Sequence, residues 1–599
     1  MPFDSLKDDE YTKETLDIEI IKRLLAYLTP YKLQVSLTLL LMGVVIGIEL
    51  LNPYFLKLAI DQYIVNKDIS GLLRLGFFMI LIKVISLYGA RQRIRIMAGV
   101  TNNILLTIRQ QLYTHIQKLP FNFFDTRPVG KILARVIGDV NSLNDLFTNS
   151  VTNLIPDLAT VVAVAAIMFS MNAKLALAAL VSLPVLVIFL GSVQVVSHQR
   201  WRIHRKKVST CNAFTHENFS GIRVVQSFTA EAKTEKFYHG LNEETLRAFI
   251  HAVSLNDFFW PSVEISWGIG TVAVCWFGVH LLNTGTITVG LLVAFISYIS
   301  MFWQPVMNIS NFYNTLVSNM SGAERIFDIM NIDPTIKDNS NAKPLPQIRG
   351  TVTFDHVYFG YENSQNVLTD ICFQVEPGQT IALVGPTGAG KTSIINLIGR
   401  FYDTREGHVL IDGFNVKAVT LESLRSQIGV VLQDTFLFSG SIKENIRYGK
   451  LNATDQEIIA AATAVHAHEF IIKLEKGYDT DVNERGSRLS FGQRQQISFA
   501  RALLSNPRIL ILDEATAGID THTERLVQRG ISQLLKGRTS FVIAHRLSTI
   551  QNADRIMVID NGGIVECGTH EELLQLKGKY YKLFTAQFRL LEDSDARIS

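Results

Sequence analysis

The sequence predicts two domains of different fold class: a membrane α-helical domain with six transmembrane helices, then an α/β domain. The first observation is a set of six long apolar stretches in the N-terminal half of a chain that is 48% hydrophobic and 19% charged. The second is the alternation of apolar strands with helices after residue 350, which is typical of an α/β fold. The third is Gly385–Thr392, which fits G-x-x-x-x-G-K-[ST] between an apolar strand and a helix. A chain of 599 residues is too long for one hydrophobic core.

The first half begins with an amphipathic helix at about residues 18–30, which we expect to lie at the membrane surface. A helix needs about 20 residues at about 1.5 Å each to cross a hydrocarbon core of about 30 Å. Six apolar stretches have nearly that length: Val35–Ile60, Leu72–Tyr88, Leu154–Met171, Leu175–Val196, Val263–Leu282 and Val289–Met307. So many stretches argue against a buried soluble bundle, and we predict a transmembrane domain over residues 1–320.

Basic residues predict how these spans are oriented. The connections Asn172–Lys174 and Asn283–Gly285 are very short, whereas the segments after spans two and four are long and rich in Arg and Lys. Basic segments stay in the cytoplasm, so we place both long segments and both chain ends there. They contain few helix breakers, and we expect the transmembrane helices to continue into them.

Two turns interrupt these cytoplasmic extensions, at Leu119–Gly130 and Ala213–Ile222. Each combines aromatic residues with a turn former at the far end of a helical hairpin. Exposed aromatic residues there favour docking to another domain. A turn that packs on itself would have the same composition.

Polar residues inside the spans are candidates for a substrate pathway. A charge at the centre of a bilayer costs at least about 2.5–3.5 kcal/mol, so Glu264 should face protein or water. With neighbours such as Trp260, it fits either a site for a cationic substrate or a polar contact between helices. Gln304, Asn308 and Asn311 recur on one face of span six, which fits a hydrated pathway or hydrogen bonds between helices.

The second half follows a linker rich in Asp, Asn, Pro and Ser, which we place at residues 321–349. We predict the nucleotide-binding domain at residues 350–588 and a polar tail at 589–599. The glycines of the Gly385–Thr392 loop allow backbone N–H groups to approach phosphate oxygens, and the following helix adds its N-terminal dipole. Lys391 can reach the outer phosphates and the Thr392 hydroxyl can bind Mg²⁺. A plain glycine turn is the alternative, but the Lys-Thr pair and the flanking strand and helix argue against it.

Strand ends supply the remaining chemistry. The apolar strand Ile509–Leu512 leads into Asp513 and Glu514, and two carboxylates there are costly unless a cation is near. Asp513 can hold Mg²⁺ and Glu514 can polarise an attacking water. Gln433 and His545 each end another apolar strand and are candidates for contacts with metal, water or γ-phosphate, although a lone His is more often structural. Tyr361 is a candidate to stack on a base, although a lone Tyr is more often a core residue.

Together these residues resemble the ATP-binding cassette (ABC) transporters, in the exporter-type half-transporter layout of the multidrug and lipid exporters. Leu489–Gln493 stands where that family has its LSGGQ signature, and Pro120–Gly130 and Glu217–Glu231 resemble its coupling hairpins. The resemblance covers nearly the whole chain. It implies ATP and Mg²⁺ as cofactors, and two cassettes that face head to tail with each ATP between one phosphate loop and the other signature. One such chain requires a second half-transporter chain as its partner.

The resemblance also implies a role for each site residue. Glu514 would be the catalytic base, His545 would contact the γ-phosphate, and Gln433 would sense Mg²⁺ and couple to the membrane domain. The ATP-binding residues would be Tyr361 (on adenine), Gly385, Thr387, Gly388, Gly390, Lys391, Thr392 and Ser393; the metal ligands Thr392, Gln433 and Asp513; and the signature and interface residues Ser490, Phe491, Gly492, Gln493 and Asp520.

The sequence departs from the family in two places. Phe491 replaces the first glycine of the signature, and the interface loop reads Ala517–Asp520, AGID, where the family usually has SALD. A benzyl group should obstruct the close approach of backbone to phosphate that glycine allows, whereas Lys391 and Glu514 are intact. In the family this split is typical of one member of a heterodimer. We therefore predict a heterodimer with two unequal ATP sites. This chain contributes its phosphate loop to the hydrolytic site and its degenerate signature to the second site. A homodimer that tolerates Phe491 is the alternative.

The function that the resemblance implies is ATP-driven export of amphipathic or hydrophobic substrates, drugs or lipids, by alternating access. Three other functions fit the same parts: a lipid flippase, an ATP-gated channel or regulatory subunit, and an importer built on the exporter layout. The predicted location is the plasma membrane of a bacterium, as a multi-pass protein with its cassette in the cytoplasm. The net charge of +3 gives no reason to expect nucleic acid as a partner.

Overall fold

The computed structural model describes residues 18–149, 153–181, 183–361, 365–432, 435–513, 521–543 and 550–586. The chain forms two compact units. The first consists of Met1–Ile116 and Gly130–Asn331, and the second of Gln117–Val129 and Ile332–Ser599. A short segment from the first half of the sequence therefore belongs with the second unit.

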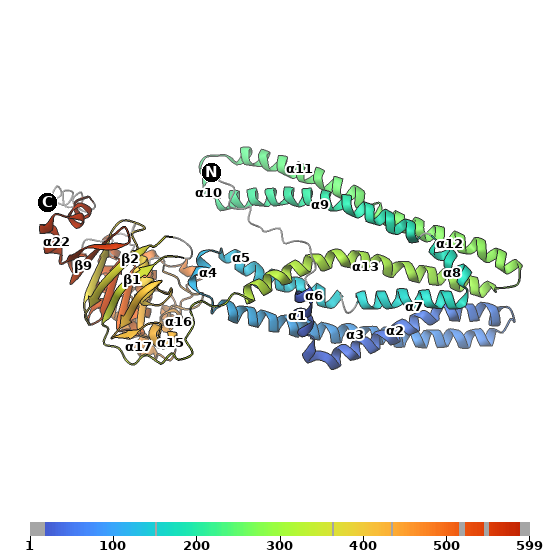
Figure 1. Ribbon diagram of the computed structural model, residues 1–599, viewed down its shortest axis with the longest axis horizontal. Helices are drawn as coiled ribbons and strands as arrows, with labels where there is room; N and C mark the ends of the chain where they lie inside the picture. Colours follow the sequence, from blue (N-terminus) through green and yellow to red (C-terminus); the bar gives the residue numbers. More distant parts are fainter. Residues whose placement is uncertain are drawn as a thin grey trace. The chain divides into compact units, whose positions relative to one another are not determined.

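The first unit is helical (Figure 1). Its helices are α1 Ile18–Ala26, α2 Lys32–Leu58, α3 Ile69–Ile116, α5 Val129–Leu133, α6 Val140–Asn149, α7 Ile155–Met171, α8 Ala173–Leu180, α9 Leu183–Ser220, α10 Ile222–Ser227, α11 Glu231–Asn256, α12 Phe259–Asn283 and α13 Val289–Met330. A 3₁₀ turn, Thr29–Tyr31, precedes α2, and π-helical turns at Ala59–Ile64 and Ala134–Asp139 follow α2 and α5.

Four helices in the described part of the chain are long and apolar enough to cross a membrane: Thr29–Ile64, Ile69–Ile116, Pro261–Asn283 and Val289–Val306. They coincide with predicted spans one, two, five and six. Span three is α7, which is apolar but has only 17 residues. Span four corresponds to α8 and the start of α9, where residue 182 lies outside the described part. Because α3 has 48 residues, it is about 72 Å long and extends well beyond a hydrocarbon core of about 30 Å, as predicted.

Local sequence determines where these helices turn. Asn172 ends the apolar helix α7, and its side-chain oxygen accepts hydrogen bonds from the backbone N–H groups of Lys174 and Leu175, at 3.1 and 3.2 Å, which starts α8. Thr288 caps α13 in the same way, through the backbone N–H of Leu291 at 3.2 Å. Both caps satisfy donors that would otherwise be unpaired at a helix start.

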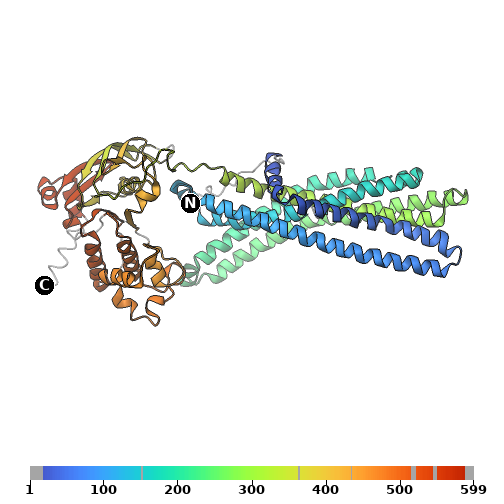
Figure 2. The ribbon, with the colours of Figure 1, turned by 90° about the horizontal axis from the view of Figure 1, so that it is seen from below.

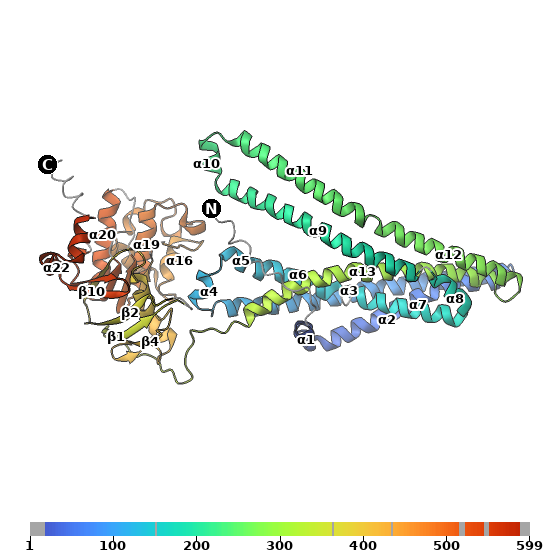
Figure 3. The same ribbon diagram turned by 45° about the horizontal axis from the view of Figure 1, so that its top comes forward.

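Neighbouring helices pair along their length in this unit. In Figures 1 and 3, α9 lies beside α11 and α2 beside α3. A buried cluster rich in aromatic residues joins α7, α8, α12 and α13, and it includes the buried side chains of Phe295 and Tyr298. The Tyr298 hydroxyl also donates to the backbone carbonyl of Leu50 in α2, at 2.8 Å, so the cluster connects helices that are far apart in sequence.

The second unit contains two sheets. The six-stranded sheet has the order β10-β9-β3-β8-β7-β6, with strands β3 Thr380–Val384, β6 Ile428–Val431, β7 Ile509–Asp513, β8 Thr539–Ile543, β9 Arg555–Asp560 and β10 Gly563–Gly568. The neighbours from β9 to β6 are parallel, and β10 is antiparallel to β9. The other sheet is antiparallel, β2-β1-β4-β5, with β1 Val352–Phe359, β2 Leu368–Val375, β4 Glu406–Ile411 and β5 Phe414–Asn415.

The helices of this unit are α4 Phe121–Asp125, α14 Lys391–Ile398, α15 Leu421–Arg425, α16 Ile442–Arg447, α17 Asp455–Ala464, α18 His468–Ile471, α19 Phe491–Leu504, α20 Thr521–Leu535 and α22 His570–Leu576. The strands β3 and β8 of the parallel sheet are buried on both sides, because one face of the sheet packs against α17, α19 and α20 and the other against α14 and the antiparallel sheet. Ile381 and Leu383 of β3 face one buried core, whereas Ala382 and Val384 face the other. Figure 2 shows the helices coloured orange beside the strands.

Candidate ATP site

The phosphate loop follows β3 and leads into α14, the context that the motif requires. Gly385 has a φ of 149°, and a Cβ there would lie 2.1 Å from the carbonyl oxygen of Ile559. Gly390 has a φ of 107°, and its Cβ would lie 2.5 Å from a methyl group of Leu368. Neither position accepts a side chain without movement of its neighbours. The two glycines therefore shape the loop, in which the residues Pro386, Thr387 and Gly388 are exposed.

Lys391 is folded back onto the loop that it follows. Its side chain is 8% exposed, and its ammonium group donates to the carbonyl oxygens of Gly385 and Pro386, at 2.7 and 2.9 Å. Burial lowers the pKa of Lys391, and the negative charge of Asp513 opposes that shift. The carboxylate at the end of β7 therefore acts electrostatically on the phosphate-loop lysine. The loop holds a desolvated cation where phosphate oxygens can replace the two carbonyl groups.

The two hydroxyl groups after Lys391 point to different surroundings. Thr392 is exposed, so its hydroxyl is free to meet a metal ion or phosphate. Ser393 is 3% exposed, and its hydroxyl is 3.1 Å from that of Tyr361. The Tyr361 ring lies edge-on to Phe359 and Tyr402, with centroid distances of 4.9 and 5.1 Å. Because Tyr361 is 36% exposed, part of its ring remains accessible to a base.

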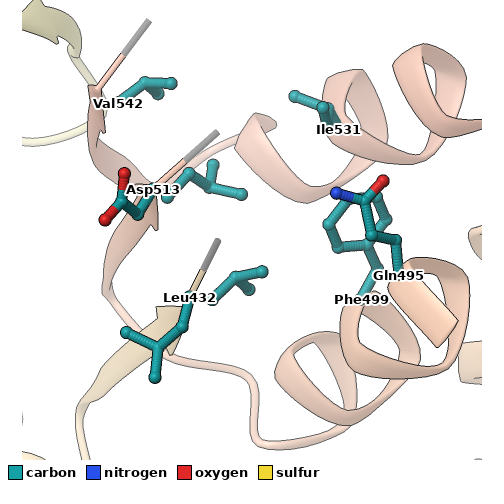
Figure 4. A pocket seen from close by; sticks show the side chains of 8 residues that line it. Leu432, Gln495, Phe499, Asp513, Ile531 and Val542 are labelled. Atoms are coloured by element: carbon teal, nitrogen blue, oxygen red, sulfur yellow. The ribbon is translucent and has the colours of Figure 1, made fainter. Parts of the chain in front are cut away.

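The strand ends meet the signature helix around a small pocket (Figure 4). Leu432 and Asp513 line it from the ends of β6 and β7, Gln495 and Phe499 from α19, and Ile531 from α20. The predicted residues Gln433, Glu514, Asp520 and His545 lie outside the described residues. In the sequence, Gln433 directly follows Leu432, and Glu514 directly follows Asp513.

The signature residues form the start of α19. The Ser490 hydroxyl accepts from the backbone N–H of Gln493 at 3.3 Å, and the Gln493 side chain accepts from the backbone N–H of Ser490 at 2.9 Å, which is a capping box. Phe491 is the first helical residue and Gly492 is buried. Phe491 is absent from the described residues with positive φ. Its side chain therefore leaves the helical backbone unstrained, and its ring lies 5.8 Å from the Arg494 guanidinium carbon.

The predicted pathway residues lie on two helices. Glu264 is exposed on α12. Gln304 and Asn308 are exposed on α13, and the Gln304 amide donates to the side-chain oxygen of Asn308 at 3.4 Å. Asn308 in turn donates to the Asp157 carboxylate of α7 at 3.3 Å, a residue that the sequence reasoning missed although it is an acid at the start of an apolar span. The side chains of Trp260 and Asn311 lie outside the described part.

Comparison with known proteins identifies the family of this chain. Residues 35–306 match the family model "ABC transporter transmembrane region" and residues 368–517 match "ABC transporter". The "Uncharacterized ABC transporter ATP-binding protein YknV" of Bacillus subtilis is 42% identical over 583 residues, which cover 97% of this chain and 96% of the relative. A "Putative multidrug export ATP-binding/permease protein" of Staphylococcus aureus is 37% identical over 580 residues, or 95% of this chain and 100% of the relative.

Among solved structures, that of a bacterial Atm1-family ABC exporter with ATP bound is similar with a TM-score of 0.77 and 28% identity, over 96% of this chain and 99% of the other. The chain therefore belongs to the ABC transporter family. It is an exporter half-transporter in which one chain fuses a membrane domain to an ATP-binding cassette. It is an ATPase coupled to transport and a multi-pass protein of a bacterial membrane.

Proposed function

We propose that this chain is a subunit of an exporter that uses ATP to move amphipathic or hydrophobic compounds, drugs or lipids, out of the cell by alternating access. The observation that carries the proposal is the presence, in one chain, of a preformed phosphate loop and of helices long enough to cross a membrane. The Staphylococcus aureus relative, which matches this chain over both domains, is named a multidrug export protein, and this name supports multidrug export. The domain limits in this proposal are 1–320, 321–349 and 350–588, and the first part of the segment 321–349 is helical because α13 continues to Met330.

The residues at the loop fit ATP with Mg²⁺. Positions that reject a Cβ, a desolvated Lys391 and an exposed Thr392 are suited to phosphate oxygens and a hard cation. Thr392, Asp513 and Gln433 would hold Mg²⁺, which would neutralise charge on the outer phosphates. In this proposal Lys391 exchanges the Gly385 and Pro386 carbonyls for phosphate oxygens, Tyr361 stacks on adenine, Glu514 polarises the attacking water, and His545 contacts the γ-phosphate. Ser490, Gly492, Gln493 and Asp520 form the interface surface toward the partner's nucleotide.

ATP can drive alternating access because it binds more tightly to the closed pair of cassettes than to the separated pair. ATP bound between two cassettes favours the closed pair, and closure shifts the membrane domains toward the outward-facing state. Hydrolysis removes the contacts to the γ-phosphate and the cassettes separate. In this scheme Glu264, Gln304 and Asn308 line the substrate pathway, together with Trp260 and Asn311.

The partner in this proposal is a different half-transporter. Phe491 places a benzyl group at the N-terminus of α19, where the family has glycine, and it narrows the approach of a phosphate to that helix end. The degenerate site would use this signature, and the hydrolytic site would use the phosphate loop of this chain. A homodimer is the second candidate, and it is favoured by the α-helical backbone at Phe491, which is not among the described residues with positive φ.

The second hairpin supplies further support for a dimer. Phe219, Val224 and Phe228, at or beside α10, are 70%, 61% and 79% exposed in the single chain. We propose that the partner chain's cassette covers them. Exposed aromatic groups of this size at a cytoplasmic turn are typical of a protein interface.

Transport by inside-out vesicles from native cells tests the export function. Vesicles that contain the wild-type chain should accumulate ethidium, an amphipathic cation, when Mg²⁺ and ATP are added, and vesicles with Glu514→Gln should not. Loss of ethidium from preloaded vesicles on addition of ATP would instead favour an importer. ATP-dependent flipping of labelled lipid without ethidium uptake would favour a flippase, and ATP-gated ion currents a channel. Equal uptake by wild-type and Glu514→Gln vesicles would refute the role of this chain as the ATPase.

A further inference from the structure

A cluster of charged and polar side chains comes from four helices of the membrane domain that pack together, α2, α3, α7 and α13. The Asn308 amide of α13 donates to one oxygen of the Asp157 carboxylate of α7, at 3.3 Å. Arg93 of α3 is close enough for Asp157 and for Glu49 of α2 to act electrostatically on its guanidinium group. Carboxylates from two helices therefore act on one cation from a third helix.

In the predicted orientation, this cluster lies within the hydrocarbon core. Asp157 is about 21 Å along α7 from the helix end at Met171. Asn308 is about 28 Å along α13 from its first residue, Val289. These helix ends are the extracellular ones in the predicted orientation. Because both distances are shorter than a core of about 30 Å, a charge at this depth needs a partner or water.

Arg93 balances the charge of Asp157 without a complete set of hydrogen bonds. Its Nε is buried and has no hydrogen-bond partner in the described part of the chain. The Lys83 ammonium lies 3.7 Å from the other carboxylate of the cluster, that of Glu49, so two acids and two bases balance. A buried donor that is left unpaired is costly. A cation that meets Asp157 more directly could therefore replace Arg93.

Apolar side chains lie beside Asp157 on α7. Leu154 and Val161 are one turn before and one turn after it on the same side of the helix, and both are half-buried. Leu158, the next residue, is 47% exposed in the single chain. One carboxylate beside apolar surface is suited to an amphipathic cation, because Asp157 meets the charge and the apolar side chains meet the rest of the molecule.

We propose that Asp157 is the residue that selects a cationic substrate, and that Arg93 is an internal cation that competes with the substrate for it. Without substrate, Arg93 balances the charge of Asp157. An amphipathic cation takes over that role when its apolar part lies against α7. The inference rests on the proposed function because it assumes that the cluster faces the substrate pathway. It adds the charge of the substrate and the residue that recognises this charge.

Uptake by inside-out vesicles that contain the full exporter tests this selection. Initial rates with Mg²⁺ and ATP are measured over a concentration series of ethidium, a cation, and of Nile red, a neutral dye. Asp157→Asn removes the charge but keeps the shape of the side chain, so the KM for ethidium should rise roughly tenfold. Arg93→Gln removes the competing cation, so the KM for ethidium should fall roughly threefold, as expected for a partly exposed charge pair. The KM for Nile red should stay the same in both variants.

Two controls accompany these variants. Arg74→Gln removes an arginine near the other end of α3, where its side chain donates to the Ser70 carbonyl of the same helix at 3.3 Å. It should behave as the wild type with both dyes. Binding of ethidium to the purified full exporter, followed by the fluorescence of the dye, does not depend on turnover, and it should weaken in Asp157→Asn and strengthen in Arg93→Gln.

The outcomes separate selection from a structural role. If Asp157→Asn raises the KM for both dyes equally, or lowers the melting temperature and leaves both KM values unchanged, Asp157 is structural and the proposal is wrong. The proposal is also wrong if Arg93→Gln weakens ethidium uptake, or if the wild type transports Nile red but not ethidium. If wild-type vesicles accumulate neither dye, the proposed function itself fails.

Discussion

Two short helices at the far ends of long helical hairpins, α4 (Phe121–Asp125) and α10 (Ile222–Ser227), have similar aromatic surroundings in the sequence but different environments in the structure. Phe123 of α4 is 4% exposed, and Asp125 is bonded to Tyr402. Phe228, directly after α10, is 79% exposed. The tip of the first hairpin therefore packs against the cassette of the same chain. The second hairpin has the exposed apolar surface that we propose the partner chain's cassette covers.

The two hairpins also differ in how their stems are held. In the first, the Asp139 carboxylate is 13% exposed and accepts from Arg325 at 2.7 and 3.1 Å and from Arg135 at 3.1 Å. In the second, the Lys207–Glu244 pair joins α9 to α11 at 2.6 Å, but its side chains are 43% and 49% exposed. Buried ion pairs are costly to break, whereas exposed pairs contribute little. The ion pairs of the first hairpin are therefore the less exposed of the two sets and should contribute more to stability.

The largest effect that we expect is from Phe123→Ala. Loss of a buried phenylalanine costs about 3–5 kcal/mol, so α4 should leave the cassette and Lys118, in the same segment, should become a site of rapid trypsin cleavage. Phe228→Ala is the matched control, because that ring is exposed in the single chain and its loss should not change the cleavage rate. Equal cleavage of the two variants would remove the distinction between the hairpins.

Asp139→Asn should have the second-largest effect. The change removes the charge that Arg325 and Arg135 share, and hydrogen bonds to charged groups contribute about 1.5–3 kcal/mol each. We expect a lower melting temperature of the full-length protein in detergent, with Asn141→Ala on the neighbouring turn as a control of smaller effect. A melting temperature equal to that of the wild type would show that the first stem is no better anchored than the second.

A double change on the second hairpin, Val224→Ser with Phe228→Ser, should act on coupling and not on the stability of the single chain. The double change makes polar the surface of α10 that we propose contacts the partner's cassette. Ethidium uptake per ATP hydrolysed should therefore fall roughly tenfold, the equivalent of about 1.4 kcal/mol of interface free energy. Thermal unfolding of the isolated chain is the control measurement. Unchanged coupling would mean that the surface has no functional partner.

The smallest effect should come from Glu244→Gln. The hydrogen bond and charge of Lys207 lower the pKa of Glu244 from 4.5. A lowered carboxylate pKa means that the pair contributes fully above pH 4.5 and is lost as the pH falls through the lowered pKa. The melting temperatures of wild type and Glu244→Gln should therefore differ slightly and constantly from pH 8 to about pH 5.5, and converge in acid. A difference that grows between pH 7 and 5.5 would contradict this assignment.

The sequence was informative where the chemistry is local. The loop Gly385–Thr392 could be predicted because its glycines, Lys391 and the following helix lie within one short segment. Ser490 and Gln493 are also close in sequence, and together they cap α19. Both turns were predicted as docking elements from their aromatic content. Which of them docks within the chain could not be predicted, because Asp125 and Tyr402 are separated by 277 residues and meet only through the fold.

The same limit explains the missed residues. Tyr402 and Asp157 are each ordinary in their local context, and their partners Asp125 and Asn308 come from distant helices. The effect of Phe491 was predicted from the glycine that it replaces. The structure adds that its backbone is helical, so the predicted effect has to arise from the bulk of the benzyl group and not from a strained main chain.

The ATPase activity of the purified chain alone, reconstituted in proteoliposomes with Mg²⁺, tests most directly whether a second, different chain completes the hydrolytic site. In this preparation the signature that faces each phosphate loop contains Phe491. We therefore predict that the ATPase rate of the wild-type chain is close to that of the Glu514→Gln variant. The rate should increase in the Phe491→Gly variant, which restores the glycine. Rapid turnover by the unmodified chain, abolished by Glu514→Gln and unchanged by Phe491→Gly, would contradict the heterodimer and establish a homodimeric exporter.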